Sequence, residues 1–263
     1  MGVSSVLLFD RAGWLLLVIP FIGILCAGFS KRVSPFVKGG KIYRHDCIAR
    51  LEHWPHALGT LFLIISGLVL GLSFWRGFTA GGSDSLFWLD VHYVAACAFL
   101  FGTFFYLANL IAEPLRGKDH LPKKHFVRSI LNHYGSKLHI KGLTYPDEGK
   151  YFQSENLAYL YALVVAALMA ATGIIKASAH IWNLPDGLMA ATTLCHDIGA
   201  ILMILFLVAH VFFAVIIPSA HKTAPSMIHG WQPVETAEKE HSAWYRAIKN
   251  NPVPQEFQDC EKE

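Results

Sequence analysis

The sequence predicts an all-α integral membrane protein with five transmembrane helices, made of a four-helix bundle and one additional N-terminal helix. Of the 263 residues, 54% are hydrophobic and only 16% are charged, whereas a soluble domain carries about 25% charged residues. The apolar residues gather in five long runs, and most Lys and Arg residues lie between these runs. Such a chain is expected to cross a bilayer several times.

The five runs are expected to be helices, because no strand-like alternation extends beyond a few residues. The first run contains Pro20 and resembles a signal peptide in position, but residues 1–10 carry no Lys or Arg ahead of it, so we expect a retained helix. The predicted spans are residues 13–29, 53–74, 86–112, 157–176 and 188–218.

Positive charge is distributed asymmetrically around these spans. All but three of the 22 Lys and Arg residues lie in segments 30–52 and 113–156 or after residue 218. The positive-inside rule places these segments in the cytoplasm of a bacterial inner membrane, with the N-terminus outside and the C-terminus inside. A long loop can carry charge without setting the topology, but three separate segments agree. The net charge of only +3 argues against a nucleic-acid partner.

The fifth span contains two histidines, His196 and His210, fourteen residues apart. Fourteen steps of about 100° end about 40° short of four full turns, so both rings leave the same face of the helix. At about 1.5 Å rise per residue they lie about 21 Å apart, which is most of the roughly 30 Å hydrocarbon core. One helix could therefore ligate two redox centres at two depths.

Two further histidines lie at matching depths on neighbouring spans. His53 begins the second span on the cytoplasmic side, and His92 lies just inside the third span on the outer side. Because haem b takes two axial imidazoles, we expect His92 with His196 at an outer haem and His53 with His210 at an inner haem. A single histidine here would be interpreted as a helix-end residue, but four at two matched depths favour ligands.

Other polar residues receive more ordinary interpretations. Arg44 and Arg50 flank the inner haem site and could bind its propionates, although ordinary positive-inside charge would also explain them. His56 is expected to be a supporting or interfacial residue. The five cysteines form no CxxC, which argues against c-type haem and iron–sulfur or zinc sites. Four loop histidines are expected to be solvated: His120, His125, His133 and His139.

Five segments resemble the membrane cytochrome b (gamma) subunit of respiratory formate dehydrogenase, which is related to the cytochrome b subunits of nickel–iron hydrogenase and thiosulfate reductase. They combine the four histidines with a Gly-Lys-Tyr segment, a Met-x-x-Gly turn and a Trp-Tyr-Arg tail. The resemblance implies the same pairing of the four histidines that their depths in the membrane indicate. The segments are residues 44–54, 88–102, 149–174, 194–230 and 241–248.

The resemblance also implies partners and a substrate. Such a subunit carries electrons between an iron–sulfur subunit, attached to a catalytic dehydrogenase or reductase subunit, and a quinone, either menaquinone or ubiquinone. We expect the quinone beside the inner haem, near Tyr151, Glu155 and His210. The family's Asn-x-x-Gln motif is replaced here by Phe152 and Glu155. Glu155 could relay protons, or it could simply be a carboxylate favoured at a helix N-terminus.

These expectations divide the chain into an additional N-terminal helix (1–30), a dihaem membrane domain (31–230, with the cytoplasmic loop 113–156) and a cytoplasmic tail (231–263). The subunit itself is expected to transfer electrons rather than to catalyse a substrate reaction, and it is a candidate to hold the quinone site. The alternatives are a histidine-lined metal transporter and a haem-free membrane anchor. The apolar stretch between His196 and His210 argues against the transporter, since a metal path needs polar residues.

Overall fold

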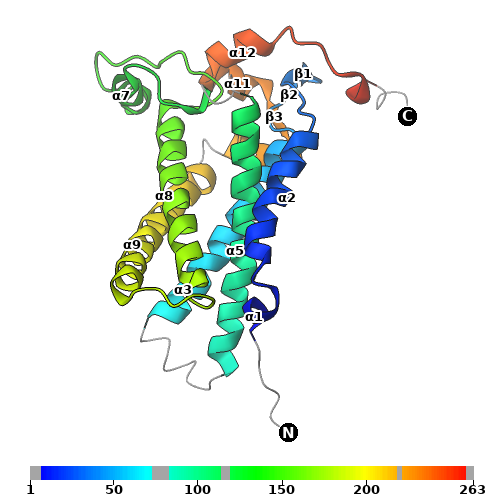
Figure 1. Ribbon diagram of the computed structural model, residues 1–263. Coiled ribbons are helices and arrows are strands. Elements are labelled where there is room, and N and C mark those ends of the chain that lie inside the picture. The colour runs from blue at the N-terminus through cyan, green and yellow to red at the C-terminus, as the bar shows by residue number, and fades with distance from the viewer. Residues whose placement is uncertain (1–6, 73–82, 114–118, 218–220, 259–263) are drawn as a thin grey trace. The chain divides into compact units, whose positions relative to one another are not determined.

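The computed structural model describes residues 7–72, 83–113, 119–217 and 221–258, and these are mostly helical (Figure 1). Within this described part, four helices are long and apolar enough to cross a membrane. The expected helix ends at Phe74 and Pro218, and the outer-side Arg76, lie outside the described residues. The four helices are α3 (Cys47–Gly71), α5 (Ser83–Ala112), α8 (Gln153–Ser178) and α9 (Asp186–Val211), which continues as the π-helix η1 (Phe212–Ile216).

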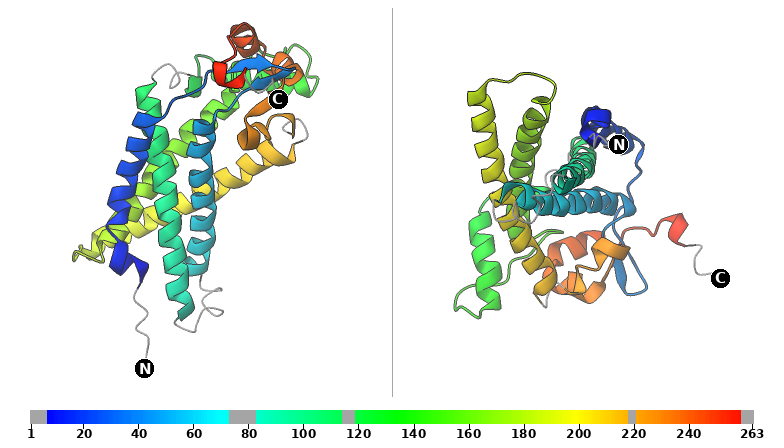
Figure 2. Two further views of the ribbon diagram at one scale, coloured as in Figure 1. Left: turned by 90° about the vertical axis from the view of Figure 1, so that its right-hand side faces the viewer. Right: turned by 90° about the horizontal axis from the view of Figure 1, so that it is seen from below.

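The N-terminal apolar run forms a shorter helix than the other four. A five-residue helix, α1 (Leu8–Ala12), precedes α2 (Leu15–Phe29), whose 15 residues extend for about 22 Å. Helix α2 runs beside α5 in the views of Figures 1 and 2. The approach is close at Gly23, where an added β-carbon would lie 2.8 Å from the carbonyl oxygen of Phe101. A glycine is therefore required for this helix contact.

The chain divides into two compact units, and several helices contribute to both. The first unit comprises Met1–Ser30, Leu51–Ala112 and Val164–Leu205. Inside it, α3 approaches α5 at Gly59, where an added β-carbon would lie 2.6 Å from the amide nitrogen of Phe99. Helix α9 approaches α8 at Gly199, where an added β-carbon would lie 2.6 Å from the sulfur of Met169. Small residues thus allow each helix pair to pack closely.

The second unit comprises Lys31–Arg50, Glu113–Leu163 and Phe206–Glu263, and it contains a small sheet that the all-α prediction missed. Strand β2 (Lys41–Tyr43) pairs antiparallel with β1 (Phe36–Lys38) and with β3 (Trp231–Pro233). Ile42, Ala237, Trp244 and Ile248 form its buried apolar core. The other helices of this unit are α7 (Phe126–Lys137), α10 (Ser226–His229), α11 (Val234–Glu240), α12 (Ser242–Ile248) and η3 (Gln255–Phe257).

Gly230 connects α10 to β3 and makes the pairing of β3 with β2 possible. Its φ of +93° lies in the left-handed region, and an added β-carbon would meet the ring of Tyr43. Its carbonyl oxygen accepts hydrogen bonds from the amides of Arg44 (2.8 Å) and His45 (3.2 Å). The Met-x-x-Gly turn at residues 227–230 therefore ties the tail to the segment that leads into α3.

Candidate haem-ligand site

His92 on α5 is held by a hydroxyl group on α3. The Ser66 hydroxyl donates to the carbonyl oxygen of Phe62, 2.6 Å away, so it accepts from Nδ1–H of His92, 2.8 Å away. This hydrogen bond fixes the imidazole as the Nδ1-protonated tautomer. The lone pair of Nε2 is then available for a metal ion.

His196 on α9 is held in the same way by α8. The Thr172 hydroxyl donates to the carbonyl oxygen of Leu168 at 2.7 Å and accepts from Nδ1–H of His196 at 2.8 Å. In both cases the hydroxyl residue is followed by a glycine, Gly67 or Gly173. An added β-carbon on either glycine would lie 3.7 Å from Cε1 of the histidine, an ordinary van der Waals distance, so each glycine lies directly beside its ring.

The two held histidines, His92 on α5 and His196 on α9, belong to the same compact unit. Each of the two residues that were predicted to ligate the outer haem is therefore held by a neighbouring helix with Nε2 unprotonated, and their pairing stays a prediction. Two neutral imidazoles that each offer Nε2 are the donor set of a low-spin haem iron. The supporting Ser66 and Thr172 were missed in the sequence, although Ser-Gly and Thr-Gly pairs inside apolar helices were visible there.

The second predicted pair falls in two different units, so its pairing stays a prediction. His53 lies in the first turns of α3, edge-on to the ring of Trp54 at 5.2 Å between centroids. His210 lies near the end of α9, where its ring stacks on Phe206. The π-helix η1 begins two residues after His210, and single π turns of this kind are frequent at functional sites.

His56 makes a third contact of the hydroxyl–histidine type. Its Nδ1 lies 3.0 Å from the Thr103 hydroxyl, which donates to the carbonyl oxygen of Phe99 at 2.7 Å. Its ring packs against Phe99 with 4.7 Å between centroids. At Gly102 an added β-carbon would lie 2.7 Å from the amide nitrogen of His56. This contact joins α3 and α5, as the supporting role expected for His56 requires.

Both arginines that were predicted to bind propionates already make hydrogen bonds to the protein. The buried Arg44 donates from Nη2 to the carbonyl oxygen of Lys150 (2.5 Å) and from Nη1 to Oε1 of Gln232 (3.1 Å). Its guanidinium lies 5.1 Å from the ring centroid of Trp244. Arg50 donates from Nη1 to the carbonyl oxygen of Ile228 at 2.7 Å.

The residues at the start of α8 show what replaces the family motif. Glu155 accepts a hydrogen bond from the amide of Phe152 at 2.9 Å, which is half of a capping box, because α8 begins at Gln153. Phe152 packs between two imidazoles, 4.4 Å from His133 and stacked at 4.5 Å on His241. Glu155 thus serves at least as a helix cap. Tyr151 packs against His120 at 4.6 Å between ring centroids.

The expectation of solvated loop histidines is wrong for two of the four. His120 and His133 are 5% and 3% exposed, because aromatic rings and a carboxylate pack around them. Nδ1 of His133 lies 3.3 Å from Oε1 of Glu148. In the tail, His241 donates from Nδ1 to the carbonyl oxygen of Gly149 at 2.8 Å. Burial, with a smaller effect of the nearby Arg44, lowers the pKa of His241 to about 2.

Comparison with known proteins adds one match. A family model described as prokaryotic cytochrome b561 matches residues 44–230, a range that includes all four predicted ligands. No curated protein matches the chain. Within the described residues, no group of three or more His, Cys, Asp and Glu side chains could hold a metal ion.

Proposed function

Because the chain belongs to the prokaryotic cytochrome b561 family, we propose that this membrane b-type cytochrome carries two haems and links an iron–sulfur subunit to the quinone pool. Each bound haem b would supply a one-electron carrier. The observation that carries the proposal is the matched pair of His92 with Ser66 and His196 with Thr172. Both rings are fixed with Nε2 unprotonated, and this is the form that haem iron binds.

Distances along the helices favour His53 over His56 as the ligand for the second haem. Ser66 marks the level of His92 on α3, and His53 precedes it by thirteen residues, about 20 Å of helix. His56 precedes it by only ten residues, about 15 Å. His196 and His210 are separated by about 21 Å on α9. The spacing therefore supports the pair of His53 with His210.

Paired substitutions test this assignment. His92→Ala and His196→Ala should each remove the same haem, seen as loss of the same component in a reduced-minus-oxidised spectrum and in haem content. His53→Ala and His210→Ala should both remove the other haem. His139→Ala, an exposed loop histidine, is the control and should retain both haems. Loss of different haems in the first two variants would overturn the pairing.

The propionates of the inner haem are proposed to lie near Arg44 and Arg50. Arg44 has its Nε buried without a hydrogen-bond partner among the described residues. Such a donor is available to an additional carboxylate. Arg44→Lys would retain the charge and remove the fork of donors, so the inner haem should show lower occupancy while the outer haem persists.

The quinone is proposed to bind beside the inner haem, near Tyr151, Glu155 and His210. Glu155→Gln retains the acceptor oxygen that caps α8 but removes the proton site. If Glu155 relays protons, quinone-linked turnover should fall while both haem spectra persist. If turnover is unchanged, Glu155 is only a helix cap and the proton route lies elsewhere.

The arrangement in the membrane completes the proposal. We place the basic segments in the cytoplasm of the inner membrane, with α2 as a fifth, shorter span and the N-terminus outside. The resemblance to the formate dehydrogenase subunit supports an iron–sulfur partner joined to a catalytic dehydrogenase or reductase subunit.

A further inference from the structure

Helix α7 carries an apolar stripe on its exposed side. Val127, Leu131, Tyr134 and the C-cap residue Leu138 follow one another at spacings of four, three and four residues, so they line one face. Leu131 is 59% exposed and Leu138 is 73% exposed. An exposed, contiguous stripe of this kind marks a surface that contacts something other than water.

The orientation of α7 is fixed by its other side. His133 is buried against Glu148, and Gly135 is buried against Leu143, where an added β-carbon would collide with the leucine side chain. Lys137 extends over the rings of Tyr145 and Phe152. Because these contacts hold the inner face, the stripe cannot rotate into the core and must remain on the outside.

The stripe lies beside the ends of two membrane-spanning helices of the same unit. The Tyr134 hydroxyl donates to Oγ of Ser154, the second residue of α8, at 3.2 Å. The Tyr134 ring is 6.4 Å from the ring of Phe213 in η1, where the last span ends. Phe213 and Ile216 are themselves more than half exposed. The apolar surface of α7 therefore continues the apolar surface of the spans.

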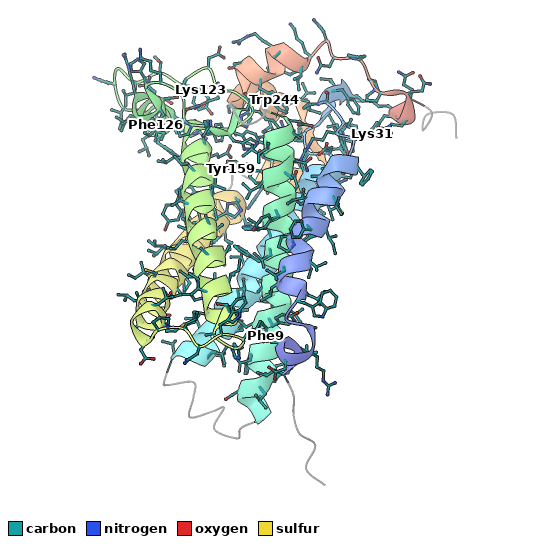
Figure 3. All side chains as sticks on the ribbon, viewed as in Figure 1. Phe9, Lys31, Lys123, Phe126, Tyr159 and Trp244 are labelled. Carbon is teal, nitrogen blue, oxygen red and sulfur yellow. The ribbon has the colours of Figure 1, made fainter. Side chains whose placement is uncertain are left out.

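Charge around the stripe has a single sign. Residues 120–146 contain five Lys and Arg residues and no Asp or Glu. Lys124, Arg128 and Lys141 are exposed, and Lys123 and Phe126 mark the start of α7 in Figure 3. A helix with one apolar face and basic flanks binds the interface of a membrane that contains anionic lipid.

We propose that α7 lies in the headgroup region of the chain's own membrane, with its apolar stripe among the acyl chains and its basic residues on anionic headgroups. Lipid, rather than a partner protein, covers this face, because the stripe is continuous with the spans and the flanking charge matches the lipid.

Photo-crosslinking from α7 tests the proposal in the full-length, haem-loaded chain. The photoreactive residue p-benzoylphenylalanine is placed at Leu131 or, as the control, at Lys239, an exposed position of α11. After irradiation in native membranes, mass spectrometry should find phospholipid adducts at position 131 and not at position 239. A protein adduct at position 131, or equal lipid adducts at both positions, would overturn the proposal.

The headgroup contacts are tested separately in nanodiscs. The yield of adduct at position 131 should be at least two-fold higher with one third phosphatidylglycerol than with phosphatidylcholine alone. The double substitution of Lys124→Gln and Arg128→Gln should remove this difference, and high salt should weaken it, because exposed charges are screened. Equal yields from the two lipid compositions in the unsubstituted chain would show that the basic residues do not bind anionic headgroups.

Discussion

At the scale of single residues, two hydroxyl groups determine which nitrogen each of two histidines presents. Ser66 and Thr172 each donate to a carbonyl oxygen in their own helix, so each can only accept from an imidazole Nδ1–H. Hydrogen bonds of this kind orient a metal-ligating histidine and increase its basicity. The two hydroxyls therefore belong to the proposed haem site as much as the histidines do.

Removal of these hydroxyls should weaken the binding of the outer haem and leave the inner haem unaffected. Ser66→Ala or Thr172→Val should lower its affinity by about 10–100-fold and raise its midpoint potential, because a less basic imidazole stabilises ferric iron less. Haem titration and a redox-monitored spectrum measure the two effects. Thr103→Val removes the analogous contact to His56 and should leave the outer haem unchanged. An unchanged potential in both test variants would contradict this role.

His241 should make the attachment of the tail sensitive to acid. Its pKa falls from 6.5 in the unfolded chain to about 2 in the folded one, because burial disfavours the charged ring. Its contribution to stability is therefore fully present above pH 6.5. It declines by up to about 1.4 kcal/mol for each pH unit below that value.

Hydrogen exchange of residues 231–250 measures this dependence between pH 7 and pH 5. His241→Asn retains a donor for the carbonyl oxygen of Gly149 but does not titrate, so its tail should show a smaller loss of protection in acid. The same loss in the variant and in the unsubstituted chain would assign the acid sensitivity to other groups.

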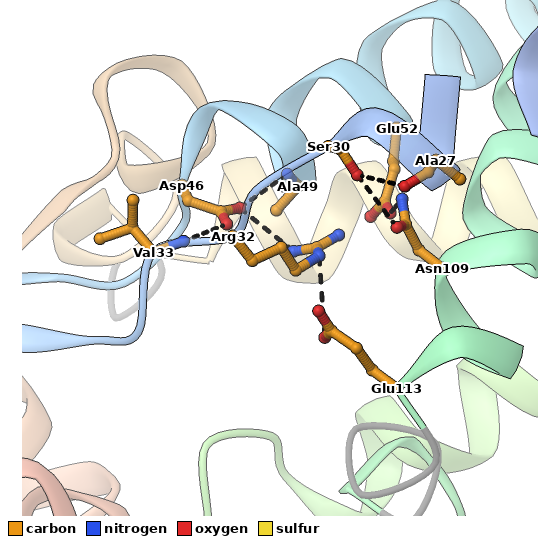
Figure 4. Close-up of polar contacts among 9 residues, drawn as sticks. All are labelled: Ala27, Ser30, Arg32, Val33, Asp46, Ala49, Glu52, Asn109 and Glu113. Atoms are coloured by element: carbon orange, nitrogen blue, oxygen red, sulfur yellow. Dashed lines mark hydrogen bonds and ion pairs between the residues drawn. The ribbon is translucent and has the colours of Figure 1, made fainter. Parts of the chain in front are cut away.

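At the scale of elements, α3 begins at a well-defined cap that also organises the segment before it. Asp46 accepts from the amide of Ala49 at 2.8 Å and from that of Val33 at 3.1 Å, and it pairs with Arg32 at 3.1 Å (Figure 4). In the first unit, Asn109 donates to Glu52 at 2.7 Å. Polar contacts thus hold the end of α3 that carries His53.

Two substitutions at Asp46 distinguish the contribution of the helix cap to stability from that of the ion pair. Asp46→Asn retains an oxygen for the Ala49 amide and loses the charge that pairs with Arg32, whereas Asp46→Ala loses both. The alanine variant should be less stable than the asparagine variant by about 1 kcal/mol, the usual value of an N-cap. Thermal unfolding of the two variants measures the difference, and equal midpoints would contradict the capping role.

The long elements could be predicted from the sequence, but the short ones could not. Apolar runs of twenty or more residues identify α3, α5, α8 and α9 without any information on partners. Strands β1, β2 and β3 have three residues each, too few for alternation of apolar and polar residues to be visible. In addition, the partners β2 and β3 are separated by most of the length of the sequence. The burial of His120 and His133 likewise depends on distant aromatic residues. The histidines of the site were visible, but the hydroxyls that hold them were not, because they lie on different helices.

At the scale of the whole molecule, the described part of the chain is a multi-pass membrane protein, and most of its Lys and Arg residues lie in the three segments of the second unit. We infer the orientation from the distribution of positive charge. Green fluorescent protein fused after residue 258 should fluoresce, and alkaline phosphatase fused there should be inactive, because we place the tail in the cytoplasm. Active phosphatase at that position would reverse the topology and move the proposed quinone site to the other membrane surface.

We propose above all that one chain holds two bis-histidine b haems at two depths. The most direct test is the haem content of the purified chain combined with a potentiometric titration of its visible spectrum. We expect two haems b per chain and two one-electron components, of which His92→Ala removes one. A single haem per chain, or a chain that binds none, would rule out the dihaem proposal.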